Sequence, residues 1–321
     1  MTLRLPEQLA LDLSTPLVNG GRCFRRDAAA SVGFSPSALR AALRDGSLRQ
    51  VLRGVFVDSR QPDDGATRLA ALELAVPPGA VVARSTAAWV RGVDATGTRS
   101  RGDPPVVECI APSGRASPRP RPGVRCQRLP FDDDDVEQLG GLLCTSPLRT
   151  AVDVLFQLRR HMALATVDAM AGAGMFTAAQ LMVEVQGWQD RRGSARAQRL
   201  ASYCEPGAQS FGESWLRLRL LDAGFPRPVA QVPLWSGDCV EYRLDLGYPR
   251  RRVGIEYDGL EFHSSPADLR RDERRRARIR EAYGWTVLVA GRGDILGRSL
   301  RFEQAVGELL GCQPRHRRRT W

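Results

Sequence analysis

The sequence predicts an α+β protein with more than one domain. Its 321 residues exceed the length at which a single hydrophobic core stops growing. Apolar residues make up 43% of the chain and charged residues 26%, which is typical of a folded soluble protein. Turn-forming residues cluster at positions 61–65 and 205–207. We therefore expect domains at residues 1–60, 61–205 and 206–312, followed by a basic tail at 313–321.

The charge of the chain favours a nucleic-acid partner. Basic residues outnumber acidic ones by 47 to 36, which gives a net charge of +11, and every basic residue is arginine. Clustered cations bind polyphosphates because they release condensed counterions. Since lysine is absent, phosphate contacts fall to guanidinium groups, and no ammonium group is available for catalysis.

Three further observations concern the location of the protein in the cell. No uncharged apolar run approaches the roughly 20 residues that a membrane helix needs. The first 20 residues contain Glu7 and Asp12 and lack the apolar core of a secretory signal. The seven cysteines are scattered without a Cys-x-x-Cys motif, so neither a zinc site nor a disulfide framework is predicted. The sequence therefore predicts a cytoplasmic protein without a membrane span.

The first segment predicts a helix, a tight turn, a second helix and a two-stranded wing. Residues 25–32 have a short helical pattern that Gly33 ends, and Ser35 before Pro36 is typical of a helix start. The second helix covers residues 37–44, with Ala38, Leu39, Ala42 and Leu43 facing inward. Residues 48–57 then alternate apolar and polar side chains, as two strands of a wing would.

The outer face of the second helix is the candidate DNA-binding surface. Arg40 and Arg44 are four residues apart and share that face with Ser37. In a winged helix-turn-helix this face enters the major groove, and Arg53 on the wing could reach a phosphate. A solvated, arginine-rich helix without a DNA partner is the alternative interpretation.

The first half of the chain resembles the AbiEi-type abortive-infection antitoxins over about 185 residues. The resemblance rests on residues 52–56 (LRGVF) and 85–93 (STAAWVRGV), a central strand at 106–111 and residues 145–153 (TSPLRTAVD). Between these motifs, the proline-rich residues 112–122 predict a surface loop. The resemblance implies operator binding through Ser37, Arg40, Arg44 and Arg53. It also implies a toxin protein or a second copy of the chain as a partner.

The last segment predicts a sheet with two carboxylates in its strands. A helix over residues 210–221 places Glu213 near its start, and strands follow at 229–234, 242–248 and 252–257. Asp245 and Glu256 lie inside the second and third of these strands, where a carboxylate is costly unless something compensates it. A hairpin between the strands would bring them together, and oxygen ligands without cysteine favour Mg²⁺ or Mn²⁺.

Further titratable residues follow the third strand. Asp258, Glu261 and His263 lie within six residues, and histidine suits proton transfer near neutral pH. A single histidine or glutamate here would be read as a surface residue. Because several acids and a histidine follow the predicted strands one after another, the sequence instead predicts a functional site.

Residues 208–300 resemble the very-short-patch-repair-like endonucleases of the PD-(D/E)XK superfamily, which have a restriction-endonuclease-like mixed sheet flanked by helices. The motif is Glu213, Asp245, residues 256–263 (EYDGLEFH), an arginine-rich helix and residues 284–287 (GWTV). The resemblance implies metal-dependent hydrolysis of DNA, with Asp245, Glu256 and the Tyr257 carbonyl at the metal. It further implies that Glu213 orients a water molecule and that His263 serves as base or proton shuttle. Asp258 stands where the superfamily has its lysine.

The helix predicted over residues 268–283 carries seven arginines, among them Arg271 and Arg275, which we expect to follow the DNA backbone. An ion-paired, solvated helix is the alternative. The leading functional prediction is a metal-dependent DNA endonuclease with a DNA-binding winged helix, acting in phage defence. The alternative prediction is a transcriptional regulator or antitoxin whose nuclease fold only holds DNA.

Overall fold

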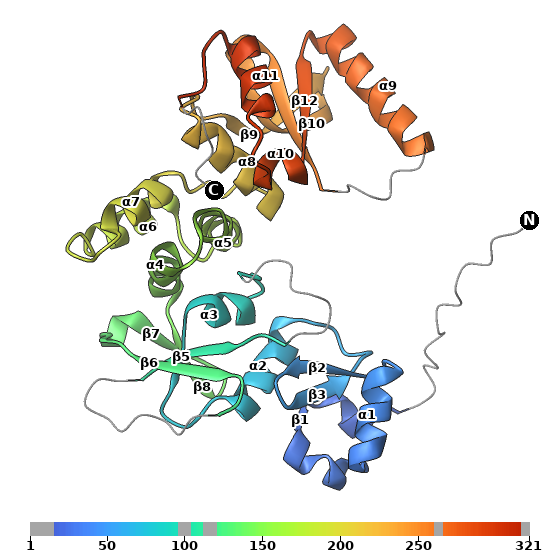
Figure 1. The fold of residues 1–321 in the computed structure, drawn as a ribbon, viewed down its shortest axis with the longest axis vertical. Coiled ribbons are helices and arrows are strands. Elements are labelled where there is room, and N and C mark those ends of the chain that lie inside the picture. The colour runs from blue at the N-terminus through green and yellow to red at the C-terminus, as the bar shows by residue number, and fades with distance from the viewer. Residues whose placement is uncertain (1–15, 96–103, 112–120, 260–265, 316–321) are drawn as a thin grey trace, which may run out of the picture. The chain divides into compact units, whose positions relative to one another are not determined.

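The computed structural model describes residues 16–95, 104–111, 121–259 and 266–315, and it confirms the predicted α+β class. The chain forms two compact units, Met1–Thr150 and Ala151–Trp321, which are described separately below (Figure 1). The domain boundaries near residues 60 and 205 are predicted from turn-forming residues in the sequence, whereas the two units are compact parts of the fold. Those boundaries therefore stay predictions. No helix in the described ranges is long and apolar enough to cross a membrane.

The first unit begins with the predicted winged helix-turn-helix. Its helix α1 starts at the predicted cap, since the Ser35 hydroxyl accepts a hydrogen bond from the Ala38 N–H at 3.2 Å. Leu39 packs with Phe24 and Phe56 in a small core, whereas Ala38, predicted to face inward, is exposed. The elements are β1 (Phe24–Arg25), α1 (Pro36–Arg44), β2 (Leu48–Leu52) and β3 (Val55–Asp58), with the strands in the order β1-β3-β2.

The helix predicted over residues 25–32 is wrong. These residues form the end of β1 and two 3₁₀ turns, η2 (Arg26–Ala28) and η3 (Ala30–Val32). Arg25 is paired with Val55 in the sheet, and the N–H groups of Ala29 and Val32 bond to carbonyls three residues back, so the segment closes as 3₁₀ turns. Gly33, at φ 88°, then turns the chain toward α1.

The rest of the first unit is a five-stranded sheet in the order β6-β5-β4-β8-β7, with α2 and α3 packed against each other. The strand predicted at residues 106–111 is β5, but the middle strand of the sheet is β4. A shared core joins this sheet to the wing, because Val51 and Val55 pack with Leu72 of α2 and Val107 of β5. The elements are α2 (Gly65–Ala75), β4 (Val81–Val82), α3 (Arg84–Val90), β5 (Val107–Ala111), β6 (Val124–Arg128), η4 (Asp133–Asp135), β7 (Val136–Leu139) and β8 (Leu142–Thr145).

The second unit combines helices with a four-stranded sheet in the order β12-β11-β10-β9. Strands β9, β10 and β11 are antiparallel neighbours, and β12 runs parallel to β11. The helix α4 (Pro147–Gln157) crosses the boundary between the units. The remaining elements are α5 (Arg160–Gly172), α6 (Ala178–Gln186), α7 (Ser194–Ser202), α8 (Phe211–Asp222), β9 (Val229–Ser236), β10 (Cys239–Tyr248), η5 (Pro249–Arg251), β11 (Val253–Asp258), α9 (Pro266–Tyr283), β12 (Thr286–Gly291), α10 (Arg292–Leu296) and α11 (Arg301–Leu310).

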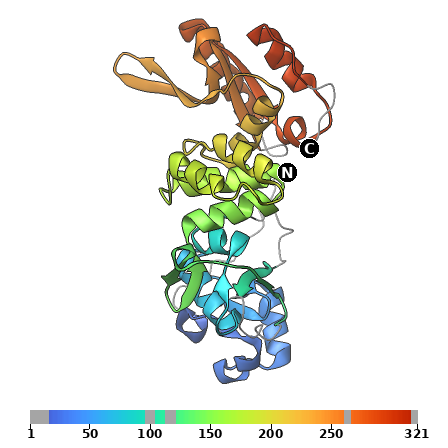
Figure 2. The same cartoon turned by 90° about the vertical axis from the view of Figure 1, so that its left-hand side faces the viewer.

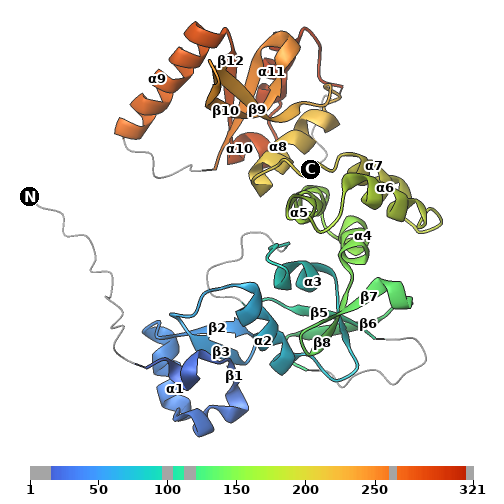
Figure 3. The same ribbon diagram turned by 180° about the vertical axis from the view of Figure 1, so that it is seen from behind.

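Helices cover both faces of this sheet. On one face, Ile279 of α9 packs with Leu244 of β10 and Trp285. On the other face, α8 and α11 pack over β11, through residues such as Leu216 and Phe302 (Figure 3). The hairpin of β9 and β10 extends beyond the other two strands (Figure 2). Every helix and strand predicted between residues 210 and 287 is present, with ends shifted by a few residues.

Candidate functional site

The predicted DNA-reading residues lie on the exposed surface of the winged helix. Ser37, Arg40 and Arg44 are all exposed on α1. The Ser37 hydroxyl lies 3.0 Å from the Ser35 hydroxyl, so it belongs to the hydrogen-bonded cap of the helix. Neither Arg40 nor Arg44 forms a salt bridge with another described residue, so both exposed guanidinium groups can reach phosphates or bases.

Arg53 occupies the turn between β2 and β3, where Gly54 adopts φ 78°. Its side chain packs against the backbone of Gly123, just before β6, because a Cβ at Gly123 would lie 2.6 Å from the Arg53 Cβ. The tip of the wing is therefore supported by the five-stranded sheet, and the exposed Arg53 side chain points out from a fixed base.

The second candidate site begins at the first turn of α8. Ser210 caps this helix by accepting a hydrogen bond from the Glu213 N–H at 3.1 Å. The Glu213 carboxylate is only 7% exposed and accepts hydrogen bonds from the Gln209 N–H at 3.0 Å and the Gln231 amide at 2.9 Å. Burial raises the pKa of Glu213, and the nearby charge of Asp245 raises it further.

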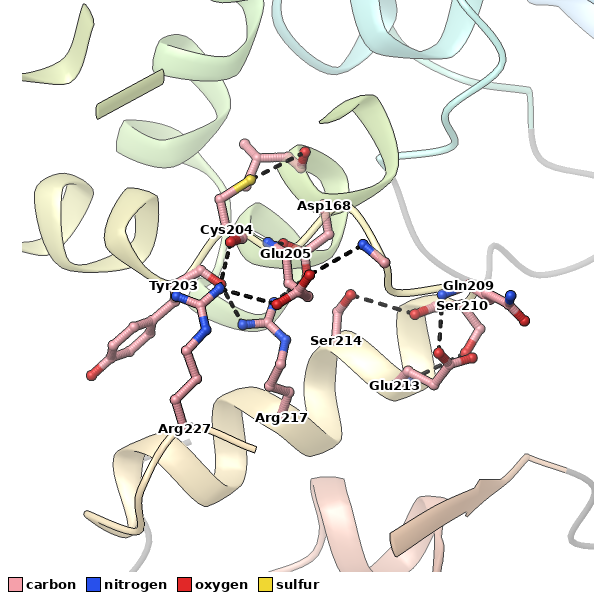
Figure 4. Close-up of polar contacts among 12 residues, drawn as sticks. Asp168, Tyr203, Cys204, Glu205, Gln209, Ser210, Glu213, Ser214, Arg217 and Arg227 are labelled. Atoms are coloured by element: carbon pink, nitrogen blue, oxygen red, sulfur yellow. Dashed lines mark hydrogen bonds and ion pairs between the residues drawn. The ribbon is translucent and has the colours of Figure 1, made fainter. Parts of the chain in front are cut away.

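A buried ion pair fixes α8 against α5 (Figure 4). The side chains of Arg217 and Asp168 are 0% and 1% exposed, and the guanidinium donates to the Asp168 carboxylate and to the Tyr203 carbonyl. The other Asp168 oxygen accepts a hydrogen bond from the Glu205 N–H at 2.8 Å. Arg217 lies one turn after Glu213, so this pair helps to set the position of Glu213. No sequence motif predicted this pair.

Asp245 and Glu256 come together where β10 and β11 meet. The pairing of these strands begins with Leu246 opposite Ile255, so the two acids are the next residue on each strand. Asp245 accepts a hydrogen bond from the Tyr257 N–H at 2.8 Å. Burial raises the pKa of both carboxyl groups, and the negative charge of Asp245 adds to the rise at Glu256. The predicted hairpin therefore brings the two acids side by side.

A cavity of about 500 Å³ opens at this pair. Its lining includes Asp245, Glu256 and Asp258 together with Arg271 and Arg275 of α9. Asp258 ends β11 and is exposed. Glu213 does not line this cavity, although it lies close enough to Asp245 for their charges to interact. The predicted Glu261 and His263 lie outside the described residues.

The donor set at the cavity fits one hard divalent cation. The two carboxylates are half-buried and have raised pKa values, so a nearby positive charge would stabilise their ionised forms. Oxygen ligands suit Mg²⁺ or Mn²⁺. Within the described ranges, however, no three histidine, cysteine, aspartate or glutamate side chains form a metal-binding cluster. Asp245 and Glu256 would therefore be the side-chain ligands, and the predicted contribution of the Tyr257 carbonyl stays a prediction.

The two arginines of α9 that were expected to bind phosphate both have acidic partners. The Arg271 side chain is 78% exposed and lies 3.3 Å from an Asp268 oxygen. The Arg275 guanidinium contacts both oxygens of Glu256, at 2.7 and 2.8 Å. Arg275 thus provides the positive charge at the carboxylate pair.

Comparison with known proteins places part of this architecture in a family. Residues 80–202 match the model of the AbiEi antitoxin C-terminal domain. The predicted likeness of residues 208–300 to nucleases stays a prediction. A solved structure, that of the RV2827C protein from Mycobacterium tuberculosis, covers 67% of this chain and 84% of its own, with 17% identity and a TM-score of 0.30.

Two curated relatives cover most of the chain. The uncharacterized proteins MT2308 and Rv2248 of Mycobacterium tuberculosis are each 32% identical over 256 residues, which is 78% of this chain and 88% of each relative. The chain belongs to the family of these two mycobacterial proteins, and its residues 80–202 match the AbiEi antitoxin C-terminal domain.

Proposed function

We propose that this protein is a DNA-binding regulator of the antitoxin type. The observation that carries the proposal is the exposed face of α1, where Arg40 and Arg44 both lie at the surface of a capped helix. The AbiEi antitoxin match at residues 80–202 supports the same role. In this proposal a toxin protein is the natural second partner.

The arrangement assigns different tasks to the residues of the winged helix. Arg40 and Arg44 contact base edges or phosphates in the major groove, where arginine binds guanine with two hydrogen bonds. Arg53 holds a backbone phosphate from the wing and fixes the orientation of the domain. The net charge of +11 adds affinity that does not depend on sequence.

A binding experiment tests this function. DNA fragments enriched by selection from genomic DNA are titrated with the wild-type protein and with the double variant Arg40→Gln/Arg44→Gln over a range of salt concentrations. Losing two phosphate contacts lowers the salt slope by about 2, and losing base contacts removes selectivity over random DNA. The matched control is Arg250→Gln/Arg251→Gln, which changes two exposed arginines of η5. If the α1 variant keeps full selectivity, the proposed surface is wrong.

A second function, metal-dependent cleavage of DNA, is favoured by the acids at the cavity. Asp245 and Glu256 meet there as half-buried neighbours, with Glu213 close to Asp245. A divalent ion held by Asp245 and Glu256 would supply a Lewis acid that lowers the pKa of water. Glu213, whose pKa is raised, would orient the attacking water or take up its proton. The backbone N–H of Tyr257 holds Asp245 in place.

Supercoiled plasmid tests this second function in Mg²⁺, Mn²⁺ or EDTA. Asp245→Asn is expected to abolish cleavage and to leave DNA affinity nearly unchanged, since phosphate binding lies with arginines. Asp238→Asn, in the exposed turn between β9 and β10, is the control. Cleavage by Asp245→Asn at the wild-type rate, or cleavage in EDTA, would remove the nuclease assignment and leave the DNA-binding role intact.

A further inference from the structure

Arg275 holds the carboxylate that the proposed metal site needs. Its guanidinium contacts both oxygens of Glu256, at 2.7 and 2.8 Å. A weaker contact of 3.4 Å joins it to the Arg243 carbonyl, and its Cζ lies 5.7 Å from the centre of the Tyr242 ring. These contacts come from β10, β11 and α9, so Arg275 bridges the helix and the sheet beside the cavity.

The pair with Glu256 opposes binding of a divalent cation. A cation held by the same carboxylate would be repelled by the guanidinium, and the interaction is strong because the Glu256 side chain is only 14% exposed. Burial raises the pKa of Asp245, and the Arg275 charge offsets part of that rise, so its positive charge reaches both acids. The protein without DNA therefore already carries one positive group at its carboxylate pair.

Arg275 also faces the cavity. Its side chain is 32% exposed and lines the cavity together with Arg271 and Arg276. A phosphate group, like the Glu256 carboxylate, offers anionic oxygens to which a guanidinium donates charge-assisted hydrogen bonds. A DNA backbone lying along α9 would thus present an alternative partner to Arg275 at the mouth of the cavity.

We propose that Arg275 couples the binding of DNA to the binding of the metal. In the free protein Arg275 pairs with Glu256 and weakens divalent cation binding. When DNA is present, Arg275 exchanges Glu256 for a phosphate and leaves Asp245 and Glu256 to the cation. The inference rests on the metal site proposed above, and it makes Arg275 a positioning residue whose two partners exclude one another.

The test measures Mn²⁺ binding to the full chain by the electron paramagnetic resonance signal of free Mn²⁺. Each variant is titrated alone and with a short phosphorothioate duplex, and the ions that the duplex binds by itself are subtracted. Arg275→Gln without DNA is expected to bind Mn²⁺ about 10-fold more tightly than the wild type, within the usual range of coupling between two sites. The duplex should tighten Mn²⁺ binding to the wild type and have little effect on Arg275→Gln.

Three further variants make the result decisive. Arg250→Gln changes an exposed arginine of η5 that does not line the cavity, and it should behave as the wild type. Asp245→Asn combined with Arg275→Gln should lose the gain in affinity. Arg275→Lys keeps the positive charge but loses the planar guanidinium, so a smaller gain than in Arg275→Gln is expected, and this variant tests the coupling even if Arg275→Gln folds poorly.

Two outcomes overturn the inference for different reasons. If Arg275→Gln and the wild type bind Mn²⁺ equally, while Asp245→Asn weakens both, the metal site stands and the coupling through Arg275 is wrong. If Asp245→Asn changes Mn²⁺ binding in no background, the metal site itself is wrong and the inference falls with it. Neither outcome affects DNA binding through α1.

Discussion

Replacing Arg217 with methionine tests whether the buried pair with Asp168 holds the second unit together. The Arg217 side chain is fully buried, and its partners are the Asp168 carboxylate on α5 and the Tyr203 carbonyl after α7 (Figure 4). Methionine fills similar space but leaves the Asp168 charge without its guanidinium. The hydrogen bond from the Glu205 N–H remains and compensates only part of that charge.

The expected loss is large. Breaking a buried ion pair by removing one partner costs about 3–5 kcal/mol in free energy of unfolding. For a unit of this size each kcal/mol corresponds to about 2–4 °C, so the melting temperature should fall by roughly 10 °C. Removing both charges in Arg217→Met/Asp168→Asn should recover much of this loss, because the amide oxygen can still accept from Glu205 and no buried charge is left unpaired.

Thermal unfolding followed by circular dichroism measures the effect, and Arg227→Met is the matched control. Arg227 contacts the same segment, through the carbonyls of Ser202 and Cys204 and the Glu205 carboxylate at 3.2 Å, but its side chain is 44% exposed. An exposed pair of this kind contributes at most about 1 kcal/mol. If Arg217→Met and Arg227→Met have the same melting temperature, burial does not strengthen the pair and the reasoning is wrong.

Two further predictions concern the surroundings of the carboxylate site. The pKa of Glu213 is higher in the folded protein than in the unfolded chain. Ionisation of Glu213 therefore lowers the free energy of unfolding as the pH rises from the unfolded pKa of about 4.3 to the folded pKa, and this loss is absent below the unfolded pKa. Glu213→Gln should therefore stabilise the protein at pH 7 by on the order of 1 kcal/mol, and melting curves at pH 4 and pH 7 that show an equal gain would contradict this reasoning. A Cβ at Gly212 would lie 1.9 Å from the Tyr257 ring, so Gly212→Ala should cost about 1–3 kcal/mol in urea unfolding. In the Tyr257→Ala background, which lacks the ring, Gly212→Ala should no longer lower the free energy of unfolding. If it still does, the strain does not come from the contact with Tyr257.

Local patterns were enough to predict the elements that carry both candidate sites. Ser35 and Pro36 predict the start of α1 because a cap acts within its own turn, and the structure has the cap hydrogen bond. Apolar residues around Asp245 and Glu256 predict β10 and β11, and the short connection between them predicts the hairpin that brings Asp245 beside Glu256. The helix predicted over residues 25–32 failed because its first residue, Arg25, pairs with Val55 of β3, a contact between separate segments that the local pattern does not contain.

Contacts between distant elements were beyond such patterns. Arg217 and Asp168 are 49 residues apart, and neither lies in a motif that names its partner. Arginine within an otherwise apolar helix was the available signal, because a guanidinium buried on such a helix needs an acid or carbonyl opposite it. The identity of that acid depends on how α5 packs on α8, which sequence periodicity does not determine.

Burial explains why Arg275 pairs with Glu256 rather than with an acid of its own helix. Its own helix offers Asp268, Asp272 and Glu273, and helical spacing alone favours pairs along the helix. An exposed pair on a helix surface gains little, whereas a half-buried carboxylate in a medium of lower dielectric attracts a cation more strongly. Glu256 is such a carboxylate, with a pKa raised by burial and by Asp245. The environment that attracts Arg275 would attract a divalent cation for the same reason, so competition between the two follows from the placement of Glu256 in the strand.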